Sequence, residues 1–187
     1  EAINNIDIGG RNLARQTAKA KTWTSSATYA WDTWIGSDGG SGWLPSILIE
    51  PEQSYTLSFD YVIEDYTDNP MSVGVSIGAG TTGSNYTADT WDSLAFFKQY
   101  GGSIESGHFV YNLSAKSPSQ LGNEKYFAFR PMRRFGDNVL TTPIKLTISN
   151  FKLEKGNKAT DWTPAPEDYY TKTETDASIQ VLSDKIS

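Results

Sequence analysis

The chain has no cysteine and a single histidine, His108, among its 187 residues. Disulfides, thiolate metal sites and metal sites built from several histidines are therefore excluded. Lysine and arginine form no cluster and the net charge is -6, so we expect no nucleic-acid partner. No run approaches the roughly 18 apolar residues that a bilayer-spanning helix requires, so we expect no membrane segment either.

The dominant pattern in the sequence is alternation of apolar and polar residues with a period of two. In YTLSFDYVIE, at 55–64, every second residue from Tyr55 to Ile63 is apolar, and polar residues occupy most positions between them. Such alternation is typical of strands that bury one face. Comparable runs occupy residues 71–78, 109–113, 127–135 and 144–148. Glycine-rich turns separate these runs, which predicts an all-β fold: a two-sheet antiparallel β-sandwich of the jelly-roll type.

The two ends of the chain differ from this middle part. Residues 1–8 resemble the end of a preceding helical linker, because two glycines follow them. Near the other end, Ile179, Leu182 and Ile186 have the spacing of a heptad seam. We therefore predict a β-sandwich over 9–168 and the start of a helical coiled-coil spacer over 169–187, with a homotrimer formed through the flanking helices. A terminal helix docked on its own domain is the alternative.

Motifs for catalysis are weak. GAGTTG at 78–83 matches G-x-G-x-x-G, but the turn-rich SNYTADTWD follows it, so we interpret it as a loop between two strands and not as a dinucleotide site. His108 has no Ser and Asp partners at a spacing that would identify it as a base. The sequence pairs no two carboxylates as a glycosidase requires. We expect no catalytic residue, with a wall-degrading enzyme as the minority alternative.

Aromatic residues, Trp23 among them, gather in and near turn-rich segments, where flat rings could stack on the apolar faces of sugars. If Phe127 and Phe129 face inward, arginines lie on the opposite face of the same run and could bind phosphate, carboxylate or paired hydroxyls. The alternative is that the tryptophans close the ends of the sandwich and the arginines balance local acids. The candidate saccharide-binding residues are Trp31, Trp34, Trp43, Tyr86, Trp91, Tyr100, Arg130 and Arg134.

Both borders of the predicted domain resemble a known group of modules. INNIDIGGRNLARQT at the start and ISNFKLEKGNKATDWTPAPED at the end are similar to the borders of modules in tail proteins of phages that infect Gram-positive bacteria. The middle resembles carbohydrate-binding modules of families 4/9 and 22 only in type. The resemblance implies a noncatalytic module at the tail tip or baseplate of the virion, which adheres to host cell-surface polysaccharide and neighbours other phage tail or baseplate proteins. A structural spacer or docking domain without its own ligand is the alternative.

The resemblance also bears on cofactors. Related sugar-binding modules often hold a structural calcium near the first and last strands, commonly with an aspartate before the aromatic residue of the last strand. Asn150 stands in that place here, so no specific motif supports calcium and we expect no cofactor. The resemblance further implies that Trp162 folds the C-terminal border back onto the sandwich.

Overall fold

The computed structural model describes residues 10–25, 47–64, 71–81, 88–99, 104–135 and 144–169. These residues form an all-β fold with seven strands and two short helical turns. The predicted helical segment at 1–8 lies outside the described residues, and so does all of the predicted spacer at 169–187 except residue 169. The strands are β1 (Lys21–Ser25), β2 (Tyr55–Glu64), β3 (Met71–Gly80), β4 (Ala88–Gln99), β5 (Glu105–Leu113), β6 (Tyr126–Phe135) and β7 (Ile144–Lys155). The helical turns are α2 (Pro118–Leu121) and the 3-10 helix η1 (Pro166–Asp168). None of the described helices is long or apolar enough to cross a bilayer.

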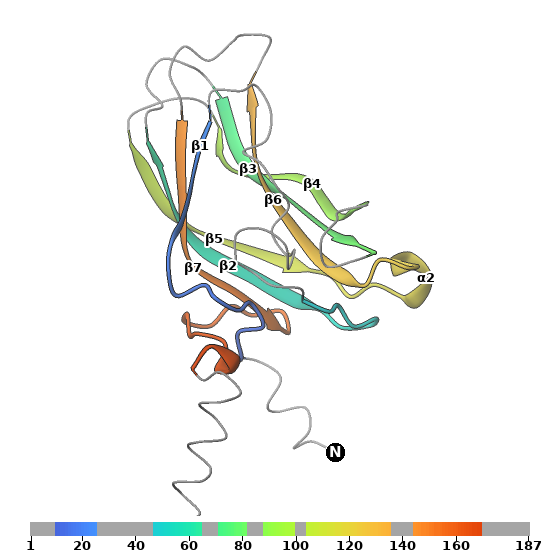
Figure 1. The fold of residues 1–187 in the computed structure, drawn as a ribbon. Coiled ribbons are helices and arrows are strands. Elements are labelled where there is room, and N and C mark those ends of the chain that lie inside the picture. Colours follow the sequence, from blue (N-terminus) through green and yellow to red (C-terminus); the bar gives the residue numbers. More distant parts are fainter. Residues whose placement is uncertain are drawn as a thin grey trace, which may run out of the picture.

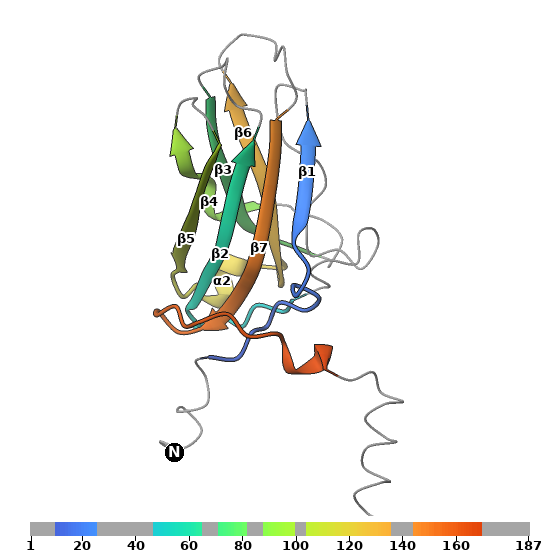
Figure 2. The same ribbon diagram turned by 90° about the vertical axis from the view of Figure 1, so that its left-hand side faces the viewer.

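The strands form two antiparallel sheets packed face to face, which confirms the predicted β-sandwich. One sheet has four strands in the order β1-β7-β2-β5, and the other has three in the order β4-β3-β6 (Figure 1). Figure 2 looks onto the four-stranded sheet, with the second sheet behind it. Residues 47–49 lie beside the start of β6, through the pairing of Leu48 with Tyr126 and backbone hydrogen bonds on either side.

The core between the sheets is built by the alternation seen in the sequence. Three phenylalanines join the sheets: Phe59 on β2, Phe151 on β7 and Phe129 on β6 are all fully buried. The Phe59 and Phe151 rings stack at 6.0 Å, and Phe129 meets Phe151 edge-on at 5.1 Å. Aromatic pairs of this geometry add about 0.5–1.5 kcal/mol each beyond their burial. This cluster fixes which face of β2 and β7 points outward, and that outer face carries the site described below.

Two tryptophans differ from the sequence interpretation. Trp23, which we grouped with the loop aromatics, lies in β1 with only 7% of its surface exposed. Trp91, assigned to a loop edge, lies within β4, because the stretch read as turn-rich is a strand from residue 88 onward. Residues 78–80 of the GAGTTG segment, which we interpreted as a loop, are the end of β3, and β4 begins at residue 88; residues 82 and 83 of the segment lie outside the described residues. Pro131 lies in β6, an edge strand of its three-stranded sheet, where a missing backbone N–H is tolerated.

Candidate functional site

The two borders of the domain are tied together at one end of the sandwich. We call residues 10–17 and 151–168, with their mutual contacts, the terminal clasp. Its centre is Asn12, which is fully buried. The Asn12 amide nitrogen donates to the carbonyls of Phe151 (3.0 Å) and Thr163 (2.9 Å). Its amide oxygen accepts from the backbone N–H groups of Ala14 (2.9 Å) and Leu153 (3.1 Å). One side chain therefore joins the N-terminal border, the last strand and the C-terminal border.

Two charged side chains of β7 point outward and are nevertheless buried, because residues 156–162 fold back over them. Lys152 and Glu154 are 1% and 0% exposed. The Lys152 ammonium donates to Thr160 Oγ1 (2.8 Å) and to the Asp161 carbonyl (2.6 Å). Glu154 accepts from the Thr160 hydroxyl (2.7 Å) and the Gly10 N–H (3.2 Å). Apart from their own ion pair at 4.0 Å, the side-chain contacts of Lys152 and Glu154 thus hold the border segments in place.

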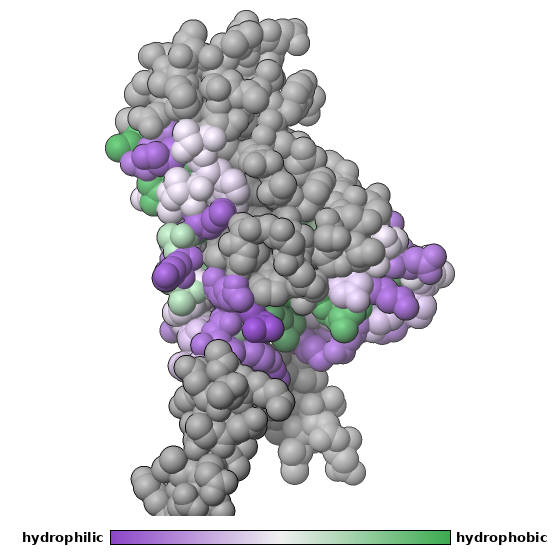
Figure 3. Space-filling model, in the orientation of Figure 1, coloured by the Kyte–Doolittle hydropathy of each residue, from purple (hydrophilic) through white to green (hydrophobic). Residues whose placement is uncertain are grey.

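Further contacts close the clasp at its surface. Arg11 forms an ion pair with Glu167, and the backbone N–H of Gln16 donates to Asp168 (2.7 Å). The Trp162 indole N–H donates to the Phe151 carbonyl (3.2 Å), so this residue does fold the C-terminal border onto the sandwich, as the resemblance implied. The chain consequently arrives and leaves side by side, and Figure 3 shows hydrophilic residues gathered at this end.

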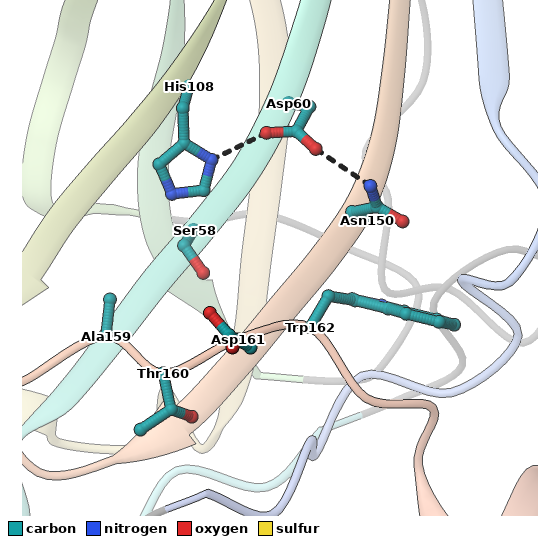
Figure 4. Close-up of a pocket in the computed structure, with 8 residues that line it drawn as sticks. All are labelled: Ser58, Asp60, His108, Asn150, Ala159, Thr160, Asp161 and Trp162. Atoms are coloured by element: carbon teal, nitrogen blue, oxygen red, sulfur yellow. Dashed lines mark hydrogen bonds and ion pairs between the residues drawn. The ribbon is translucent and has the colours of Figure 1, made fainter.

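A polar hollow lies beside the clasp, on the outer face of the four-stranded sheet. We call it the outer-face hollow; its volume is about 280 Å³ (Figure 4). It lies between outward-facing side chains of β2, β5 and β7 and residues 159–162 of the C-terminal border, which fold back beside the sheet. Its lining residues are Ser58, Asp60, His108, Asn150, Ala159, Thr160, Asp161 and Trp162. Hydroxyl, carboxylate, imidazole and amide groups therefore converge there.

Three of these side chains form a fixed row across three strands. Asp60 on β2 stands directly opposite His108 on β5. The His108 Nδ1 and the Asp60 Oδ1 are 2.6 Å apart, and the Asn150 amide donates to the Asp60 Oδ2 at 2.8 Å. Asn150 reaches this position because it lies in a β-bulge of β7 with a positive φ of 52°, a conformation that asparagine tolerates better than most residues.

The neighbours of Asp60 lower the pKa of its carboxyl. Burial alone would raise the pKa of its carboxyl, but the hydrogen bonds from Asn150 and His108 outweigh burial and lower the pKa below its ordinary value. Asp60 is therefore a carboxylate throughout the neutral range. The carboxylate also lines the hollow.

Two polar groups in the hollow are unengaged. Ser58 is only 3% exposed, yet its hydroxyl makes no hydrogen bond within the described part of the chain. Asp161 likewise makes no ion pair or side-chain hydrogen bond there. Figure 4 shows the Ser58 hydroxyl and the Asp161 carboxylate directed toward one another across the hollow, while the Trp162 indole extends to one side. The other hollow of note, about 440 Å³ between residues 48–51 and α2, is lined mainly by apolar side chains.

The structure describes only part of the predicted saccharide surface. Trp91 is half-buried against the core, with its indole N–H donating to the Ser114 carbonyl (2.9 Å), so its ring edge is already engaged. In β6 the backbone register places Arg130 opposite Ser76 and Arg134 opposite Ser72. The described residues do not bring Trp91 into the outer-face hollow. The candidates outside the described residues are Trp31, Trp34, Trp43, Tyr86 and Tyr100.

The residues at the calcium position of related modules do not fit an ion. The Asn150 amide nitrogen, a donor, points at Asp60, and the neighbouring Phe151 carbonyl already accepts from Asn12, Thr17 and Trp162. Among the described residues there is no group of three or more His, Asp or Glu side chains that could hold a metal.

Sequence reasoning missed the outer-face hollow almost entirely. His108 was recognised as a residue on an alternating strand, but its partner Asp60 lies 48 positions away. Only the register of β2 against β5 brings them together, and alternation does not reveal register. The available signal was the pair of border motifs, since the C-terminal one supplies Asn150 and the segment 159–162.

Comparison with known proteins gives a likeness in fold. No family model matches the chain, and no curated protein matches it. Among solved structures, the tripod (BppUct-A-L) from the baseplate of bacteriophage Tuc2009 aligns with 89% of this chain at a TM-score of 0.52 and 11% identity. This chain spans 63% of the length of that protein.

Two further structures align at lower scores. One is described as a CBM4 (TM-score 0.36, 12% identity, 69% of this chain and 95% of that one). The other is a cyclase from Fischerella sp. TAU (TM-score 0.37, 15% identity, 82% of this chain and 83% of that one). At these scores neither carries an argument. The chain is thus similar in fold to a phage baseplate protein over most of its length.

Proposed function

We propose that the chain is a noncatalytic saccharide-binding module of a phage tail protein, carried at the tail tip or baseplate of the virion, and that it adheres to cell-wall polysaccharide of a Gram-positive host. The observation that carries the proposal is the outer-face hollow, where directional polar groups meet beside the indole of Trp162. Saccharide sites combine these two elements, because hydroxyls need hydrogen-bond partners and sugar rings have apolar faces. The fold likeness to the Tuc2009 baseplate tripod supports the tail context.

The terminal clasp supports the idea of a module within a longer fibre. Because the two borders lie side by side, a fibre could run past the sandwich and carry it as a lateral domain. We propose that 1–8 and 169–187 are the flanking helices of such a fibre, which trimerise and contact other tail or baseplate proteins. If residues 47–49 are counted as the second of eight strands, the sheets have four strands each, as in a jelly roll.

A single site of this kind should be weak. About 280 Å³ is near the lower limit for ligand pockets, which suits one sugar unit. Net gains of about 1 kcal/mol per hydrogen bond, after the cost of association, give dissociation constants near the millimolar range. Several copies on one particle would raise the effective affinity by about two to four orders of magnitude. The candidate aromatic and arginine residues remain part of the proposal as a second contact surface.

The test is affinity electrophoresis of the full chain in gels that contain wall polysaccharide purified from Gram-positive bacteria. We expect retarded migration that increases with polysaccharide concentration, without release of reducing ends. Trp31→Ala, Trp34→Ala and Trp43→Ala would show whether the predicted aromatic surface contributes. Unchanged migration with every polysaccharide would reject the proposal, and reducing ends would point to a wall-degrading enzyme.

The second candidate is a structural spacer or docking domain without a ligand of its own. The terminal clasp favours it, because a domain tied at its own borders can be carried in a fibre whether or not it binds anything. This candidate predicts no retardation by any polysaccharide, so the same gels separate the two.

A further inference from the structure

We propose that the outer-face hollow is a subsite for one neutral, hydroxyl-rich sugar ring, which binds through a hydroxyl placed between Ser58 and Asp161. The ligand class rests on the proposed function, whereas the position and the charge preference come from the hollow itself. No residue of the hollow belongs to the aromatic and arginine surface that the sequence predicted. The subsite is therefore a separate place of contact with its own test.

The Ser58 hydroxyl points to a ligand. Ser58 as a residue is only 3% exposed, and its hydroxyl makes no hydrogen bond within the described part of the chain. Buried polar groups in proteins are almost always paired, and an unpaired one destabilises the fold. Ser58 is aimed into the hollow, toward the free Asp161 carboxylate (Figure 4). A sugar hydroxyl between them could accept from Ser58 and donate to Asp161, which satisfies both groups.

The surroundings hold this arrangement rigid. Asp60 is fixed by His108 on one side and Asn150 on the other, each from a different strand. Asp161 is held through its backbone, because its carbonyl accepts from the buried Lys152 ammonium at 2.6 Å. Groups positioned in advance by their neighbours lose little freedom when a ligand binds, which lowers the cost of binding.

The charges of the hollow select among sugars. Asp60 and Asp161 are carboxylates, and the nearest buried cation, Lys152, points its ammonium at Thr160 and the Asp161 carbonyl and is paired with Glu154. Arginine is absent from the lining. A phosphorylated or carboxylated sugar would face two like charges, whereas neutral hydroxyls can donate to both. The hollow should therefore prefer neutral rings.

His108 provides a direct assay, since it is the only histidine in the chain and its imidazole lines the hollow. Its aromatic NMR signals can be followed without assigning the rest of the protein. Full-length chain is titrated with methyl glucoside, methyl galactoside and N-acetylglucosamine, and separately with glucose 6-phosphate. We expect a saturable shift with at least one neutral sugar in the millimolar range, and at least ten-fold weaker binding of glucose 6-phosphate.

Two serine variants sharpen the assay. Ser58→Ala removes the unpaired hydroxyl without breaking a described hydrogen bond, so the protein should fold normally and bind about five-fold more weakly, as the loss of one hydrogen bond predicts. Ser106→Ala removes an exposed serine from the face of β5 that also carries His108, and it should leave the affinity for the sugar unchanged. Absence of a saturable His108 shift with every neutral sugar, unchanged affinity of Ser58→Ala, or equal binding of glucose 6-phosphate would each overturn the subsite. If the wild type is still retarded by wall polysaccharide in that case, the proposed function stands and only the subsite fails.

Discussion

Replacement of Asn12 by alanine should destabilise the whole domain, although Asn12 lies at its border. The substitution removes the partner of two backbone N–H groups, those of Ala14 and Leu153, in residues that are both fully buried. Each buried N–H left without a partner costs about 1–3 kcal/mol. The Phe151 carbonyl keeps two other donors, Thr17 and Trp162, so the loss of its hydrogen bond from Asn12 costs little stability. We therefore expect Asn12→Ala to lower the free energy of unfolding by about 3–5 kcal/mol.

Urea denaturation followed by tryptophan fluorescence measures this change. In a domain of this size about 3–5 kcal/mol corresponds to a fall in Tm of roughly 6–20 °C. Asn112→Ala is the matched control, because Asn112 is exposed and accepts one side-chain hydrogen bond, from Thr56 at 3.1 Å. It should cost about 0.5–1 kcal/mol. A loss below 1 kcal/mol for Asn12→Ala, or equal losses for both variants, would refute the view that Asn12 holds the clasp.

Three other substitutions have defined outcomes. Glu154→Ala leaves the buried Lys152 ammonium without its ionic partner and should cost about 3–5 kcal/mol in urea denaturation; a midpoint equal to that of the wild type would contradict this. Gly107→Ala places a methyl group 2.7 Å from Tyr61 Cζ on the neighbouring strand and should cost about 1–3 kcal/mol, whereas an unchanged Tm would show that the ring moves aside freely. The lowered pKa of Asp60 means that its contribution to stability is complete above about pH 4 and is lost as the pH falls through the lowered value. The stability difference between wild type and Asp60→Asn should therefore be present at neutral pH and vanish in acid; a difference that grows in acid would contradict a lowered pKa.

Period-two alternation was sufficient to predict the layers of this fold. In β2 the residues Tyr55, Leu57, Phe59 and Ile63 are fully buried, as the pattern predicted. Apolar residues at every second position of a strand lie on one face, and that face packs into the core. The same reasoning failed for Trp23 and Trp91. Both lie in strands, but polar neighbours such as Thr22, Thr24 and Asp92 surround them, and the segments resembled turns.

The candidate site could not be predicted in the same way. Ser58 and Asp60 alternate outward as expected, but only tertiary structure determines what covers them. Thr56 and Ser58 are buried on the outer face, and the Thr56 hydroxyl donates to the Gly156 carbonyl of the returning border. The folding of the C-terminal border over the outer face leaves no local pattern in the sequence, and neither does the pairing of Asp60 with His108. The border motifs marked where the domain begins and ends, and the structure shows that Asn12 and residues 151–163 there are joined by hydrogen bonds.

Isothermal titration calorimetry of the full chain with purified Gram-positive wall polysaccharide measures saccharide binding itself, and reducing ends assayed afterwards in the same sample reveal any cleavage. We expect saturable heat, a dissociation constant near the millimolar range per repeating unit, and no newly formed reducing ends. Heat no greater than that of dilution with all polysaccharides tested would refute saccharide binding, and the domain would then be a spacer held by its clasp.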